Sequence, residues 1–459
     1  MTHAAVVEGR AAGTAHRARA RVTAAVACMP LMLGCAVVWA GMDVSCEDPM
    51  FFREAGVNVV FVPAEGTNGA LSSQAQEIVL LMQREMLFRL LAYGSIGVER
   101  LYDPGSRPCN LTRIHSVLFG DGQRPGALHE GHGAVVISEH LYEDRTGILV
   151  QTYLDYGFYR AVDRVSFAVG AGDASQTFVF EASQPPVIFA PRGLAPETIA
   201  QLHQDYQTVA VLHAKPDDAS PGIPLALVPK VPFAYYVVDA QGPWMRVQSP
   251  DGRAGWTRGT VGVGGSTVSR VLPELDAIEG AAGYLLARAP APGGEGQAHL
   301  KTEVTRERLQ QLTLQAFARY LGQVSSIESH RTLSTVHMLA GTVRLPQGTV
   351  RGDQAMLESV GSEYQQAVAL DPYNSDAYQL RALLRLTRAS VNGTPPGADL
   401  MAVHHDLWRA ASISPEELGI VRNLDQLYQL PSARATQFGL AGEEFQKQAT
   451  SLRELVKAQ

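Results

Sequence analysis

Strand-like and helix-like patterns are separated along this chain of 459 residues, and the separation restricts the folds open to it. Apolar runs typical of strands occur between residues 57 and 258, where two helical patterns interrupt them. Beyond residue 300 the patterns become helical. Grouped strands followed by grouped helices predict a multidomain α+β protein. The length exceeds what one hydrophobic core serves and indicates about three domains.

Residues 1–40 carry the pattern of an export signal. Four arginines precede an apolar run from Val22 to Ala40, and small residues precede Gly41. This favours a signal peptide cleaved before Gly41. The run is also long enough to remain as a membrane anchor, and lipidation at Cys35 is a third alternative. All three predict an exported body, located in a bacterial periplasm or cell envelope.

The exported body holds two cysteines, Cys46 and Cys109. An exported pair is a disulfide candidate. The bridge would close a loop of about 60 residues and stabilise the fold by about 4 kcal/mol. Two unrelated buried thiols are the alternative.

Residues 41–186 read as a small α/β domain. A buried strand over 57–64 precedes a helix over 74–93, for which Ser72 and Ser73 are N-cap candidates, and a strand begins near 97. The turn 143–146 joins two longer strands as a hairpin. This order resembles TolB-like envelope-assembly domains, and the resemblance implies protein contacts in the cell envelope. A connecting helix follows within 187–206.

The stretch "GPWMRVQSPDGRAGWTRG" places two tryptophans around an Asp-Gly turn. Together with the preceding strands, it resembles a bacterial Src-homology-3 (SH3b) domain over residues 207–263, which implies a small β-barrel. In that barrel Trp256 and Gly252 are structural, and Tyr235, Tyr236 and Trp244 are the candidates for a ligand groove. Residues 264–299 are predicted to be a linker, and their last part, 287–299, is rich in proline, glycine and alanine.

Residues 300–459 are predicted to be a helical domain. The segment "EYQQAVALDPYNSDAYQLRALLRL" resembles the junction between two tetratricopeptide (TPR) repeats, and a weaker copy surrounds Ala410 and Pro415. Such repeats bury each other's faces and leave a concave surface for peptides or partner helices. The structural residues of the first junction are Tyr364, Ala367, Pro372, Tyr378 and Ala382.

The sequence offers no catalytic constellation, so we expect neither an enzyme nor a cofactor. His129 and His132 are three residues apart between glycines, which fits a polar loop better than a helical metal motif, and we expect no metal site. No nucleophile motif of the common hydrolase types occurs. The net charge of -7 argues against nucleic acid as a partner.

These features predict a non-catalytic, exported cell-envelope protein that acts as a protein-protein interaction scaffold through its repeats and its barrel. One alternative is a protein that binds peptidoglycan or modifies the cell wall. Another is a periplasmic accessory subunit of a secretion or surface-assembly machine. Contact with a membrane is expected only through the N-terminal segment, if it stays uncleaved.

Overall fold

The computed structural model describes residues 55–428, except for positions 63, 94–95, 101–131, 146, 160–161, 170–175, 184–185, 210, 225–232, 249–253, 259–265, 290–303, 325, 346–353 and 393–396. The segment predicted to be an export signal, Cys46, Cys109, Gly252 and His129 therefore lie outside the described residues.

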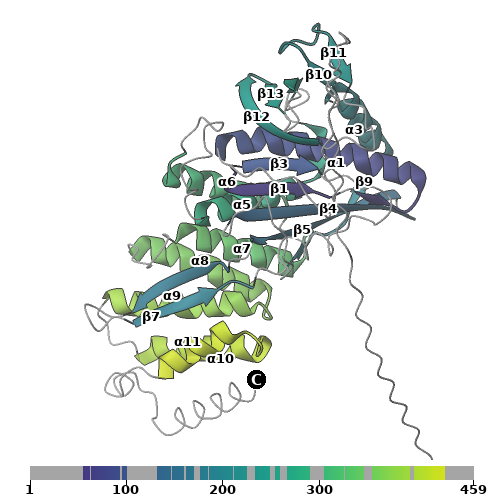
Figure 1. Cartoon of the computed structure of the whole chain (residues 1–459). Coiled ribbons are helices and arrows are strands. Elements are labelled where there is room, and N and C mark those ends of the chain that lie inside the picture. The colour runs from purple at the N-terminus through teal and green to yellow at the C-terminus, as the bar shows by residue number, and fades with distance from the viewer. Residues whose placement is uncertain are drawn as a thin grey trace, which may run out of the picture. The chain divides into compact units, whose positions relative to one another are not determined.

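A mixed sheet is built around strand β1 (Val57–Phe61), which lies between β3 (Ile96–Arg100) and β4 (Gly133–Asp144) and runs parallel to both (Figure 1). All five residues of β1 are buried, including Asn58, as the largely apolar sequence predicts. The hairpin expected over 134–156 is confirmed by the antiparallel pairing of β4 with β5 (Gly147–Phe158). Three short strands extend this part of the sheet: β2 (Glu65–Gly66), β8 (Val187–Ile188) and β9 (Arg192–Leu194).

Helix α1 (Gly69–Leu90) follows β2 and continues into a 3-10 turn over Leu91–Tyr93. The prediction that Ser72 or Ser73 caps it was wrong. The helix begins earlier, because the Asn68 side chain accepts a hydrogen bond of 3.0 Å from the Leu71 amide. The Gln76 side chain donates to the Ala64 carbonyl at 3.0 Å.

The strands of the predicted barrel belong to the same sheet. Strand β12 pairs on one side with β13 and on the other with β3, both antiparallel. The segment is therefore joined to the α/β part by backbone hydrogen bonds, and its expected start at residue 207 falls inside a helix, α3. The elements are α3 (Pro196–Val209), β10 (Val211–His213), β11 (Gly222–Pro224), β12 (Phe233–Gln241), β13 (Trp244–Gln248) and β14 (Ala254–Arg258).

The predicted linker 264–299 was wrong over most of its length, because it contains helices α4 (Thr267–Val271) and α5 (Glu274–Arg288). Helix α5 is buried almost all round and packs against β1, β4 and β5 as well as α1, α6 and α7. Its glycines are needed for this close packing. A Cβ atom at Gly280 would lie 2.3 Å from the Phe317 ring.

The C-terminal part is helical, as predicted. Consecutive helices pack in pairs, α5 with α6, α7 with α8, and α9 with α10. Their bounds are α6 (Arg306–Val324), α7 (His330–Arg344), α8 (Gln354–Leu370), α9 (Ser375–Asn392), α10 (Gly397–Ile413) and α11 (Leu418–Tyr428).

Strands β6 (Arg164–Val169) and β7 (Gln176–Glu181) form a second, two-stranded sheet. This hairpin packs on helices of the C-terminal part, with α9 against both strands and α11 against β7 (Figure 1). Its phenylalanines Phe167, Phe178 and Phe180 are buried. The chain from Gly41 onward accordingly groups into one compact unit.

Candidate binding sites of the C-terminal helices

The helices hold the β6–β7 hairpin by hydrogen bonds to its backbone. The buried Asn423 amide of α11 donates to the Val179 carbonyl at 2.7 Å and accepts from the Val179 amide at 3.3 Å. The Asp376 carboxylate of α9 accepts from the Ser183 amide at 3.1 Å and from its hydroxyl at 2.8 Å. Side chains of two helices thus bind an extended segment as a neighbouring strand would. This face of helices α9 and α11 is occupied by the chain itself.

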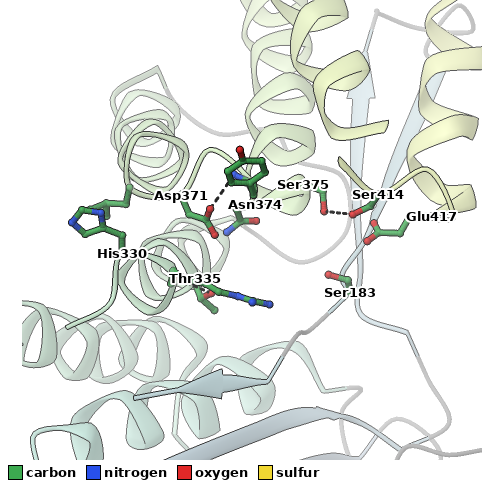
Figure 2. A pocket seen from close by; sticks show the side chains of 11 residues that line it. Ser183, His330, Thr335, Asp371, Asn374, Ser375, Ser414 and Glu417 are labelled. Carbon is green, nitrogen blue, oxygen red and sulfur yellow. Dashed lines mark hydrogen bonds between the residues drawn. The ribbon is translucent and has the colours of Figure 1, made fainter. Parts of the chain in front are cut away.

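A cavity of about 570 Å³ opens beside Ser183, where the hairpin leaves these helices (Figure 2). The start of α7 forms one side of it, and the α10–α11 turn forms the other, with the α8–α9 turn between them. Its size is typical of small-ligand sites. The lining residues are Ser183, His330, Arg331, Thr335, Leu370, Asp371, Tyr373, Asn374, Ser375, Ser414 and Glu417.

Hydrogen bonds fix the turn that lies between the two sides. Asp371 accepts from the Tyr373 amide at 2.9 Å. The Asn374 side chain donates to the Ser334 hydroxyl at 3.0 Å and accepts from the Ala377 amide at 2.9 Å. These bonds give the cavity a preorganised wall.

Two charged side chains of the cavity stand apart from this network. Arg331 on α7 is exposed, and within the described part of the chain no carboxylate lies within ion-pairing distance of its guanidinium. Glu417 on the opposite side likewise has no cationic partner among the described residues. Burial and the nearby charges of Asp376 and Glu416 raise the pKa of Glu417 to about 7. A positive charge placed at Glu417 would be favoured.

An exposed patch, which we call the aromatic surface, lies on α10 and the α8–α9 turn. Tyr373 is 74% exposed, Met401 51% and Trp408 50%. Met401 and Trp408 are two helical turns apart on α10 and so share a face. The Arg409 guanidinium lies 5.8 Å from the Tyr373 ring centre and joins the turn to the helix.

The predicted groove residues lie on the strands of the sheet. Tyr235 and Tyr236 are on β12, with Tyr235 opposite Val98 of β3. Trp244 on β13 is buried, with the Arg258 guanidinium 5.2 Å from its ring centre and the His213 ring edge-on at 5.1 Å. A ligand that stacks on Trp244 therefore requires Arg258 to move. The groove role stays a prediction.

The residues predicted to be structural lie where helices or strands pack. Trp256 is buried on β14. Tyr364 and Ala367 on α8, and Tyr378 and Ala382 on α9, are buried, and Pro372 lies in the turn between these helices. Sequence reasoning missed Asp376, Asn423, Arg331 and Glu417, which belong to no motif. The one available signal was the amphipathic spacing around them.

Carboxylates of helix α5 form ion pairs and hydrogen bonds with residues of the sheet part and of helix α6. Asp276 accepts from Arg89 of α1 at 2.7 Å and from Arg319 of α6 at 2.9 Å. Glu274 receives a hydrogen bond of 3.2 Å from Thr152 of β5 and lies 3.6 Å from Arg192, which also pairs with Glu328 at 3.0 Å. These carboxylates are buried, and their partners give them a structural role.

No group of three or more histidine, cysteine, aspartate or glutamate side chains in the described residues could hold a metal ion. None of the helices that the structure describes is long and apolar enough to cross a bilayer. No protein-family model, no curated protein and no solved structure matches the chain.

Proposed function

We propose that the protein is a non-catalytic, exported scaffold of the cell envelope that recruits partner proteins through its helical repeats. The observation that carries this proposal is the aromatic surface of Tyr373, Met401 and Trp408 beside Arg409. Tryptophan, tyrosine, methionine and arginine are the residues enriched in interface cores, and a few of them supply most of the binding energy.

The location of this surface supports the repeats as the recruiting part. The hairpin already covers the face formed by α9 and α11, so a partner meets α10 and the α8–α9 turn instead. Export rests on the arginine-flanked apolar leader. Peptidoglycan binding and an accessory role in a secretion machine stay predictions.

The test uses the full-length protein in the cells that make it, with a photocrosslinking amino acid at position 408 or 373. We expect covalent adducts with one partner protein in the envelope fraction. Trp408→Ala combined with Tyr373→Ala should weaken capture of that partner by tenfold or more, because hot-spot truncations cost about 2 kcal/mol each. Leu418→Ala, which removes another exposed apolar side chain, is the matched control.

Adducts that form equally from position 418 would show nonspecific contact. An absence of adducts from both 373 and 408 would remove the recruiting role.

A further inference from the structure

We propose that the cavity beside Ser183 binds a short peptide with free ends, with its carboxylate at Arg331 and its ammonium group at Glu417. This inference goes beyond the scaffold role, because it concerns a small ligand in a preformed cavity. Tyr373 belongs to both the cavity lining and the aromatic surface, so the two proposals are tested separately at Arg331 and Glu417 for the cavity and at Trp408 for the surface.

Arg331 is suited to a terminal carboxylate. It is the second residue of α7, whose N-terminal end is capped by the Ser329 hydroxyl through a bond of 3.1 Å from the Thr332 amide. A guanidinium offers a planar pair of donors to a carboxylate, and the positive end of the helix dipole adds to the attraction. No described carboxylate competes for Arg331.

Glu417 is suited to an ammonium group. Its carboxyl is half-buried and has Asp376 and Glu416 as negative neighbours. An incoming cation would relieve this repulsion and replace solvent that the half-buried carboxylate has lost. The remaining charged groups lining the cavity are Asp371, which is bound to its own turn, and His330 on the α7 side.

The cavity also suits the middle of a peptide. The Ser183 and Thr335 hydroxyls donate to Asp376 and to the Arg331 carbonyl, and each oxygen can still accept from a peptide N–H. The Asn374 amide has a second N–H, beyond the one given to Ser334, for a peptide C=O. Leu370 and Tyr373 add apolar surface for small side chains. An extended chain spans about 3.3–3.6 Å per residue, so two to four residues cover roughly 7–14 Å, the scale of a cavity of this volume.

Charges of opposite sign on the two sides disfavour ligands with a single charge. A simple anion would satisfy Arg331 but would meet Glu417, and a simple amine would satisfy Glu417 but would meet Arg331. A ligand with both charges satisfies both.

The test is calorimetric titration of the full-length protein with alanine peptides of two, three and four residues. Each is used unblocked, N-acetylated and C-amidated. We expect saturable binding of at least one unblocked peptide, and a loss of about tenfold or more on blocking either end, since each blocked end removes one charge-assisted hydrogen bond.

Variants assign the two ends. With Arg331→Gln, amidation should no longer matter, while acetylation still weakens binding. Glu417→Gln should show the reverse. Arg422→Gln alters an exposed charge outside the cavity lining and should bind like the unaltered protein.

Absence of saturable binding by all three unblocked lengths would overturn the proposal, and so would equal binding of blocked and unblocked peptides. Thermal unfolding of each variant confirms that it is folded. These outcomes are independent of crosslinking at Trp408, so the two proposals can fail separately.

Discussion

At the scale of single residues, burial of the Glu139 carboxyl lowers the free energy of unfolding. It lies on β4 opposite Thr152, whose hydroxyl binds Glu274, and neither of its oxygens has a hydrogen-bond partner among the described residues. Burial and the charge of Glu274 hold the pKa of Glu139 well above its usual range. Burial also raises the pKa of Glu274 to about 7, against the opposing effect of Arg192.

Glu139→Gln should therefore stabilise the protein at high pH. A carboxyl whose pKa is higher in the folded state favours folding below its unfolded pKa, and that advantage is lost as pH rises through the folded pKa. The two proteins should have similar unfolding free energies near pH 4.5. By pH 8 the variant should be more stable by at least about 1.4 kcal/mol, because the folded protein keeps the carboxyl protonated after the unfolded chain has ionised it.

Urea unfolding at pH 4.5, 6 and 8 measures this difference. Glu143→Gln, an exposed position on the same strand, is the control and should show no such trend. A constant difference across pH would mean that Glu139 does not titrate with folding.

Gly280 tests how closely α5 and α6 approach. A Cβ atom there would overlap the Phe317 ring, so Gly280→Ala should destabilise the protein by about 1–3 kcal/mol despite the better helix propensity of alanine. Gly322→Ala on α6, where a Cβ atom meets nothing within 4 Å, should instead be neutral or stabilising. Denaturant midpoints of the two variants decide the comparison.

At the scale of elements, the hairpin β6–β7 depends on Asn423. Asn423→Leu leaves the Val179 N–H and C=O without their partners, which should cost about 1–3 kcal/mol. Hydrogen exchange at the Val179 amide should accelerate, while exchange in β1 stays slow. Arg422→Ala, on the exposed side of the same helix, is the control. Unchanged exchange at Val179 would mean that strand pairing alone protects it.

Sequence patterns predicted the elements well where one periodicity dominates. The largely apolar run of β1, the hairpin of β4 and β5, and the helices from α6 onward were predicted correctly. The error at α5 has a physical cause. The linker prediction rested on residues 287–299 and was extended over α5. In the fold the glycines of α5 permit close packing, and its buried acids pair with arginines on α1 and α6 that are distant in sequence. The cavity lined by Arg331 and Glu417 could not be predicted from the sequence. It forms where the start of α7, the α8–α9 turn and the α10–α11 turn lie close together.

At the scale of the whole molecule, the α/β part and the C-terminal helices should unfold together. Buried contacts join them at several points, including Arg192 with Glu328 and Asp163 with Arg288. We expect one calorimetric transition for the full chain, with equal calorimetric and van't Hoff enthalpies. Residues 300–459 expressed alone lack both α5 and the hairpin, so they should unfold at a much lower temperature than the full chain. Two separated transitions in the full chain would contradict this.

The bond between Val179 and Asn423 joins residues 244 positions apart. A ribosome adds about 5–20 residues per second, so roughly 12–50 s pass between the synthesis of the two partners. Throughout that interval the phenylalanines of the hairpin lack their helical cover, and the edge of β7 is open to other chains. Any product truncated before residue 423 should therefore leave this hairpin uncovered and aggregate through it.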